Sequence, residues 1–212
     1  MVIAIDGPAG AGKSTVARGV ADALGLTYLD SGAMYRCVAL AGLRARADLD
    51  DGEATGEIAR RARIDLRARR VELNAEDVTD AIRAPDVDEA ASRVSVHPQV
   101  RAAMVERQRE LISCGGYVAE GRDIGTVVSP DAPLKVFLTA SGDERARRRA
   151  AQTGQRLDDV AVAQRERDAR DRGREHSPLD RADDAVELDT TGLSVEEVIE
   201  RVVNLARERG LA

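Results

Sequence analysis

The sequence predicts an α/β fold built on a doubly wound parallel sheet of five strands. Short apolar runs alternate along the chain with segments whose apolar residues recur at helical spacing. A glycine-rich loop joins the first apolar run to the first helical segment. Such alternation is typical of parallel sheets covered by helices. With 212 residues, the chain is long enough for a single domain with insertions, 1–212, but too short for two full domains.

The first elements show why each prediction is made. Residues 2–6 form an apolar run that ends in Asp6, which suits a buried parallel strand. Residues 14–24 carry apolar side chains at Val16, Val20 and Leu24, and Gly25 follows as a C-cap. By the same criteria, further strands are expected at 26–30, 117–120, 134–140 and 185–189, and further helices at 32–46 and 195–209.

Two stretches depart from this alternation. Residues 64–66 and 71–74 alternate like an antiparallel hairpin, and we assign residues 63–95 to a small insert that contains it. Residues 151–176 are very polar and rich in Arg and Asp, and we interpret them as a helical lid that closes over a ligand. A solvated helix is the alternative for this second stretch.

Composition limits the possible partners and location. The net charge of −6 argues against a general affinity for nucleic acid. No apolar run approaches the roughly 20 residues that span a bilayer. Two cysteines, Cys37 and Cys114, fit a packing role in a reducing cytosol. A soluble cytoplasmic protein without a membrane or nucleic-acid partner is therefore expected.

Lysine is rare in this chain. Of 32 basic residues only Lys13 and Lys135 are lysines, so 30 are arginines. Lys135 is expected at a solvated position beside a strand. Lys13 ends the glycine-rich loop, where a compact charge suits phosphate better than the planar guanidinium of arginine.

Residues 7–14 read GPAGAGKS and match the P-loop pattern G-x-x-x-x-G-K-[ST] in full. Glycines allow the backbone N–H groups of such a loop to surround phosphate, and the following helix adds its N-terminal donors. Ser14 is a candidate Mg²⁺ ligand. A guanine-reading N-K-x-D segment is absent, since neither Asn74 nor Asn204 precedes a lysine. The expected ATP contacts are Gly7, Pro8, Ala9, Gly10, Ala11, Gly12, Lys13, Ser14 and Thr15.

A second group of candidates follows the next two strands. Ser31 and Arg36 lie at the start of a predicted helix, where they can hold an anion. Glu120 ends a predicted strand, and Arg122 and Asp123 follow it. In open α/β sheets this carboxyl edge lines the ligand crevice. Glu120 is a candidate for holding Mg²⁺ through water. A surface charge at Arg36 and a structural Arg–Asp pair at 122–123 are the alternatives.

The lid carries a patterned set of charges. Arg167, Arg170, Asp171 and Arg174 fall at i, i+3, i+4 and i+7, which places them on one face if the helix continues through them. Three guanidiniums on one face repel each other until an anion arrives, so we predict a phosphate clamp. The flanking Arg165 and Arg172 are expected in solvent, and the dense run 145–149 mostly at the surface.

Taken together, the motifs resemble those of the bacterial cytidylate kinase family over essentially the whole chain. The similar segments are IDGPAGAGKST (5–15), LDSGAMYR (29–36), LNAEDVTDAIR (73–83), AASRVS (90–95), VRAAMVERQR (100–109), VAEGRDIGTVV (118–128), PDAPLKVFLTAS (130–141) and RDARDRGREHSPLD (167–180). The P-loop is shared by many families, whereas the combination of the last three segments is close to family-specific.

The resemblance implies a P-loop kinase that transfers the γ-phosphoryl group of ATP to CMP or dCMP with Mg²⁺, and we expect a monomer. It implies that Ser31, Arg36, Arg122 and Arg174 bind the acceptor phosphate, that Ser92, Arg101 and Asp123 read cytosine, and that Arg167 and Asp171 contact the sugar. Residues 63–95 would be the enlarged monophosphate-binding insert of the bacterial members. The expected catalytic residues are Lys13, Arg122, Arg167, Arg170 and Arg174.

Two alternatives remain open from the sequence. One is another small-acceptor P-loop kinase, of the uridylate, shikimate or dephospho-coenzyme A type. The other is a nucleotide-binding interaction protein without turnover, against which the charged face at 167–174 argues. The loop 189–192, after the last predicted strand, is a plausible edge for the donor adenine.

Overall fold

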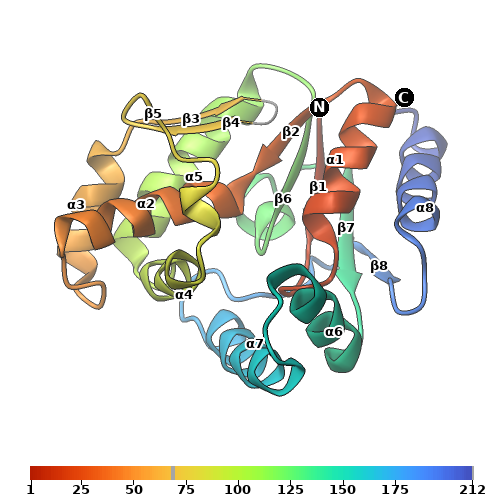
Figure 1. Cartoon of the computed structure of the whole chain (residues 1–212). Coiled ribbons are helices and arrows are strands. Elements are labelled where there is room, and N and C mark those ends of the chain that lie inside the picture. The colour runs from red at the N-terminus through yellow and green to blue at the C-terminus, as the bar shows by residue number, and fades with distance from the viewer. Residues whose placement is uncertain (68–69, 212) are drawn as a thin grey trace. The chain divides into compact units, whose positions relative to one another are not determined.

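The computed structural model describes residues 1–67 and 70–211. Its packing divides the chain into two compact units (Figure 1). The first unit comprises Met1–Tyr28 and Gly115–Ala212, and the second comprises Leu29–Cys114. The predicted insert, 63–95, lies within the second unit, which extends beyond it along the chain in both directions.

The five-stranded parallel sheet that the sequence predicts forms the centre of the first unit, apart from Leu29 and Asp30, the last two residues of an edge strand, which belong to the second unit. Its strands are β1 (Val2–Asp6), β2 (Thr27–Asp30), β6 (Tyr117–Gly121), β7 (Leu134–Thr139) and β8 (Val186–Asp189). Their order is β2-β6-β1-β7-β8, with β1 paired in parallel to both β6 and β7. Because later strands are added on both sides of β1, the sheet is doubly wound, as predicted.

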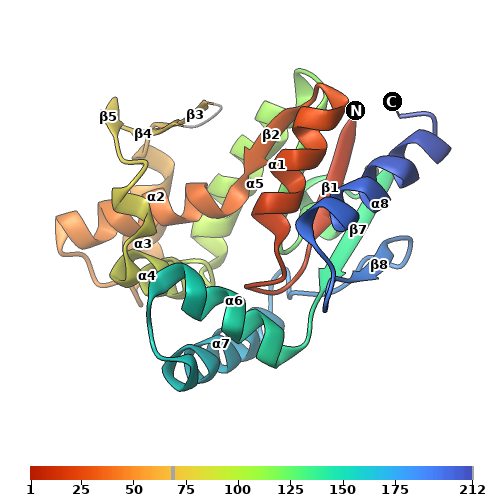
Figure 2. The same cartoon turned by 45° about the vertical axis from the view of Figure 1, so that its right-hand side comes forward.

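One face of the sheet forms the main core. Ile3, Ile5 and Val136 are buried against α1 (Lys13–Leu24) and α8 (Val195–Glu208). The two helices lie side by side against the strands (Figure 2). The remaining elements of this unit are the short π-helical segment η2 (Ile124–Val128), α6 (Gly142–Thr153) and α7 (Leu157–Arg172).

The other sheet face gives a correction. Lys135 was expected in solvent, but its side chain is only 8% exposed, and Nζ lies 2.8 Å from Asp184 Oδ1. Side chains of β7 alternate between the two faces, so Lys135 points away from the α1–α8 core. Its long apolar stem packs beside Gly125, where an added Cβ would lie 3.1 Å from the Lys135 Cδ.

The second unit combines helices with a small antiparallel sheet. The predicted hairpin is confirmed as β3 (Ile64–Arg67) and β4 (Arg70–Leu73), in which Ile64 pairs with Leu73. A short third strand, β5 (Glu76–Asp77), adds to β4 and was not expected from the sequence. The helical elements are α2 (Ser31–Ala45), α3 (Gly52–Arg61), η1 (Ala81–Arg83), α4 (Pro85–Val94) and α5 (Pro98–Ser113). Among the described residues, no helix has the length and hydropathy that crossing a membrane requires.

Candidate active site

The P-loop follows β1 and leads directly into α1. Gly7 has a φ of +146°, and a Cβ there would lie 2.1 Å from the Leu138 carbonyl oxygen. Gly12, with a φ of +90°, is the N-cap of α1. Both positions therefore require glycine. Ser14 and Thr15 are exposed in the first turn of the helix, where backbone N–H groups lack intrahelical partners.

Lys13 is buried within a group of cations. Its side chain donates from Nζ to the Pro8 carbonyl oxygen at 2.9 Å, and the residue is only 6% exposed. Burial lowers the pKa of Lys13, and the positive charges of Arg122 and Arg167 lower it further. The three cations thus converge from the P-loop, the end of β6 and the lid helix. A bound phosphate would relieve their mutual repulsion.

The carboxyl end of β6 contributes the second part of this region. Glu120 is 5% exposed, and its Oε1 accepts a hydrogen bond from the Tyr28 hydroxyl at 2.8 Å. The Asp123 carbonyl oxygen accepts a hydrogen bond from Val127 N at 2.9 Å, and this bond lies at the start of η2. The side chain of Asp123 is buried in the same turn.

The lid corrects one detail of the predicted pattern. Helix α7 ends at Arg172, with Gly173 as its C-cap, so Arg174 lies beyond the helix rather than on its face. Arg174 nevertheless ion-pairs with Asp171, whose other oxygen lies 2.8 Å from Arg122 Nε. Burial would raise the pKa of Asp171, but Arg122 and Arg174 outweigh it and hold the pKa below its usual value. Asp171 thus joins the lid to the end of β6.

The remaining predicted acceptor residues lie in the second unit. Ser31 begins α2, and Arg36 Nη2 on the same helix lies 3.0 Å from Asp88 Oδ1 of α4. Ser92 and Arg101 are 3% and 4% exposed. Arg101 Nη1 donates to the Ser95 carbonyl oxygen at 3.4 Å. Within the described residues, the buried Ser92 Oγ has no hydrogen-bond partner, as expected of a group that awaits a ligand.

Comparison with known proteins identifies the family of this chain. The family model described as Cytidylate kinase matches residues 3–208. The chain belongs to the cytidylate kinase family. A cytidylate kinase of Solibacter usitatus is 49% identical over 216 residues, spanning 99% of this chain and 93% of that protein. One from Stutzerimonas stutzeri is 48% identical over 222 residues, spanning 100% and 97%.

Solved structures show the fold of this cytidylate kinase family member in more distant proteins. An uncharacterized protein from Eubacterium ventriosum has a TM-score of 0.56 at 12% identity, with 98% of each chain covered. A sugar kinase from Janibacter sp. has a TM-score of 0.51 at 15% identity, with 100% of this chain and 97% of that chain covered. At these identities the likeness concerns the fold alone.

Two arginines of α6 were expected mostly at the surface and are not. Arg145 is buried and donates from Nη1 to the Ala9 carbonyl oxygen of the P-loop at 3.1 Å. Arg148 donates from Nη1 to Thr190 Oγ1 at 2.9 Å and from Nη2 to the Thr190 carbonyl oxygen at 2.7 Å. Thr190 Oγ1 lies 3.3 Å from the Ala11 carbonyl oxygen. The high density of arginines in residues 145–149 does not indicate which of them point inward.

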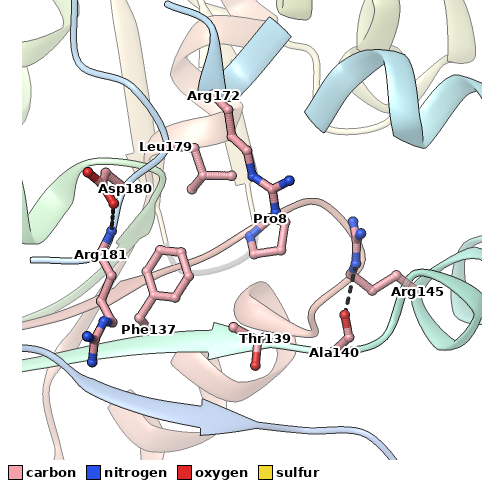
Figure 3. A pocket seen from close by; sticks show the side chains of 9 residues that line it. All are labelled: Pro8, Phe137, Thr139, Ala140, Arg145, Arg172, Leu179, Asp180 and Arg181. Carbon is pink, nitrogen blue, oxygen red and sulfur yellow. Dashed lines mark hydrogen bonds between the residues drawn. The ribbon is translucent and has the colours of Figure 1, made fainter. Parts of the chain in front are cut away.

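A pocket of about 240 Å³ lies beside the P-loop in the first unit (Figure 3). Arg172, at the end of α7, extends into it toward Pro8, and Phe137 lines its floor. Asp180 borders the same space, so the charges on its walls are mixed. The other lining residues are Thr139, Ala140, Arg145, Leu179 and Arg181.

Asp6 is a further residue at this end of the sheet that sequence reasoning did not assign. Its Oδ1 accepts from Ile124 N at 2.9 Å and its Oδ2 accepts from Gly125 N at 2.7 Å. The carboxylate thus fixes the start of η2, directly after Arg122 and Asp123. The sequence did offer one signal for this role, since Asp6 is an acidic residue at the end of an otherwise apolar strand.

Asp6 should make stability depend on pH. Burial raises its pKa to about 6 from 3.8, against the opposing effect of the Gly125 and Ile124 N–H groups. Because the folded-state pKa is raised, the contribution to stability is present in acid and is lost as pH rises through about 6. Relative to wild type, the Asp6→Asn variant should therefore lose up to about 3 kcal/mol of unfolding free energy between pH 7 and pH 4. Urea denaturation of both proteins across this range measures it, and a constant difference would contradict the assignment.

Proposed function

We propose that the protein transfers the γ-phosphoryl group of ATP to CMP or dCMP, releasing ADP and CDP or dCDP. The observation that carries the proposal is the convergence of Lys13, Arg122 and Arg167 beside a complete P-loop. Three cations gathered at one place suit a group that bears several negative oxygens. Membership of the cytidylate kinase family supports CMP and dCMP as the acceptors.

The residues have complementary tasks in such a transfer. The P-loop N–H groups and Lys13 bind the β- and γ-phosphates of the donor. Arg122, Arg167, Arg170 and Arg174 compensate the charge on the transferring oxygens, and the lid keeps water from the reacting group. Because phosphoryl transfer needs little covalent chemistry from the protein, positioning and charge account for most of the catalysis.

Magnesium fits the donor set at this site. The Ser14 hydroxyl is exposed in the first turn of α1, and Glu120 supplies a carboxylate at the end of β6. Both offer the hard oxygen ligands that Mg²⁺ prefers, Glu120 through water. When bound, the ion neutralises charge on the phosphates. We further propose a cytoplasmic monomer whose partners are these small molecules alone.

An acceptor screen tests the activity. Purified protein with ATP and Mg²⁺ is offered CMP, dCMP, UMP, AMP, GMP, shikimate and dephospho-coenzyme A, and ADP release is followed. We expect the highest kcat/KM for CMP and dCMP. Preference for another acceptor would replace the proposed substrate, and ADP release that no acceptor stimulates would indicate a nucleotide-binding protein without turnover.

Cytosine recognition is proposed for Ser92, Arg101 and Asp123. Cytosine offers an N4 amino group to an acid and N3 and O2 acceptors to donors such as Arg and Ser. Two observations support the assignment: Ser92 and Arg101 are both deeply buried, and the Ser92 Oγ has no hydrogen-bond partner within the described part of the chain. Ser31, Arg36, Arg122 and Arg174 are proposed for the acceptor phosphate, and Arg167 and Asp171 for the sugar.

Ser92→Ala separates ligand binding from folding. Since the Ser92 Oγ has no hydrogen-bond partner among the described residues, its removal should leave thermal stability unchanged or slightly raised. The KM for CMP should rise about 3- to 10-fold for a loss of roughly 0.5–1.5 kcal/mol, with the KM for ATP unchanged. Arg101→Ala should raise the KM for CMP by about 10-fold or more, because that hydrogen bond is charge-assisted. Initial-rate kinetics and thermal melts measure both effects.

Substitutions at nearby positions provide the controls. Ser95→Ala removes a hydroxyl that donates to the Ser92 carbonyl oxygen at 3.1 Å, so it should lower stability but spare the KM for CMP. Arg109→Ala, at an exposed position of α5, should leave the KM for CMP unchanged. An unchanged KM for CMP in both Ser92→Ala and Arg101→Ala would remove these residues from base recognition while leaving the kinase activity standing.

A further inference from the structure

The lid helix α7 packs against the rest of the first unit mainly through polar side chains. Its buried residues are Val160, Gln164, Asp168 and Asp171, which recur at helical spacing along one face. Only one of the four is apolar. The orientation of the helix therefore depends on which charged groups these side chains contact.

Arg145 of α6 is the contact for the middle of this face. Its Nη2 lies 2.8 Å from Asp168 Oδ2, with the two side chains 10% and 8% exposed. The Gln164 Nε2 donates to the Arg145 carbonyl oxygen at 3.3 Å. Residues 164 and 168 lie one turn apart, so α7 is held on Arg145 at two successive turns.

The same arginine also holds the P-loop. Its Nη1 donates to the Ala9 carbonyl oxygen at 3.1 Å, and its Nε donates to the Ala140 carbonyl oxygen after β7 at 3.2 Å (Figure 3). A Cβ at Gly10 would lie 2.9 Å from the Gln164 Nε2 and 3.0 Å from the Arg145 Cβ. One guanidinium thus connects the P-loop, the central sheet and the lid helix.

Among the described residues, the ion pairs that join α7 to Arg122 and to Arg145 differ in kind. Arg122–Asp171 involves an arginine proposed to bind the acceptor phosphate, so a substrate can compete for it. Arg145–Asp168 uses neither a P-loop side chain nor a proposed substrate contact. It can persist while phosphate contacts form and break.

The Arg145–Asp168 pair is poorly built for stability alone. Within the described residues, the Asp168 Oδ1 is buried without a hydrogen-bond partner. Buried ion pairs contribute little net stability even when fully satisfied, because desolvation offsets the attraction. Asp168 directly follows Arg167, the lid cation that lowers the pKa of Lys13.

We propose that Arg145 and Asp168 are positioning residues that set Arg167 of the lid helix against the P-loop for phosphoryl transfer. The pair acts through Arg167 and touches no reacting atom. This inference rests on the proposed kinase activity and adds to it two residues that carry no substrate. A displacement of α7 by a fraction of an ångström would weaken the charge compensation that Arg167 provides.

A double-mutant cycle on kcat tests the proposal with CMP and ATP. Asp168→Asn should lower kcat about 10- to 100-fold and change both KM values less than about 3-fold, since positioning for the chemical step differs from binding. In the Arg167→Ala background, Asp168→Asn should lower kcat by less than about 3-fold further. Asp168→Glu should recover part of the activity. Asp159→Asn, exposed in the first turn of α7, is the matched control and should leave kcat unchanged.

The outcomes separate this proposal from the kinase assignment. Equal losses of kcat in both backgrounds would overturn the positioning role. A kcat within about 3-fold of wild type for Asp168→Asn would also overturn it. In either case, turnover of CMP by the wild-type protein would leave the proposed kinase activity in place. If Asp168→Asn does not fold, the same cycle is run with Gln164→Ala, for which a loss of about 3- to 10-fold should vanish in the Arg167→Ala background. Failure of the wild type to phosphorylate CMP would instead remove the proposed function.

Discussion

Lys13→Ala should reduce kcat to the limit of detection while leaving the fold intact. The side chain supplies the compact charge of the P-loop, and burial together with Arg122 and Arg167 already lowers its pKa. Its removal relieves repulsion among the cations, so the thermal midpoint should fall by no more than a few degrees. Coupled-assay kinetics with CMP and thermal denaturation provide the two measurements.

Lys13→Arg should also be severely impaired, although it keeps the charge. A planar guanidinium does not fit the position of an ammonium that donates to the Pro8 carbonyl oxygen inside the loop. The matched control is Lys135→Arg, the same exchange at the only other lysine, which pairs with Asp184 away from the P-loop. We expect the control to retain kcat within about 3-fold. A wild-type kcat for Lys13→Arg would contradict the requirement for a compact charge.

Loss of single lid arginines should act mainly on the chemical step. Ala variants of Arg167, Arg170 and Arg174 should each lower kcat by about 10²- to 10⁴-fold, by analogy with other groups that stabilise transition-state charge. Arg174 should have the additional effect of leaving Asp171 with Arg122 as its remaining ion-pair partner among the described residues. Steady-state kinetics with CMP and ATP separate kcat from the two KM values.

Arg165→Ala is the control for this series. Arg165 is exposed on the same helix, so its loss should change kcat by less than about 2-fold. If the variants at 167, 170 and 174 behaved like this control, these arginines would not take part in phosphoryl transfer, and the predicted phosphate clamp would be wrong.

Local chemistry explains what could be predicted. The P-loop pattern specifies backbone geometry through its glycines, and Gly7 and Gly12 adopt the positive φ angles that this pattern implies. The alternation of apolar and polar residues around Ile64 and Val71 likewise predicted a hairpin. Successive side chains of a strand point to opposite faces, so this pattern is a property of the strand itself. The predicted shared face does not include Arg174, because the charged residues keep helical spacing as far as Arg174 whereas the helix ends at Arg172.

The direction of charged side chains was harder to predict. Arg145 and Arg148 sit in a run of similar residues, and only α6 packing turns them toward Ala9 and Thr190. Lys135 was placed in solvent because its partner, Asp184, lies 49 residues away in the sequence. Composition shows how many charges a segment carries but not which of them find a partner.

The sequence alone determined the fold class, the P-loop, the family resemblance and the candidate residues, because each depends on residue type and short-range spacing. The tertiary structure decided that Asp171 joins Arg122 to Arg174 and that Arg145 joins the P-loop to Asp168. It also decided that Asp6 supports the start of η2. These contacts link residues far apart in the chain, and their strength depends on burial and on distances of a few ångströms. Neither quantity exists until the strands and helices are packed.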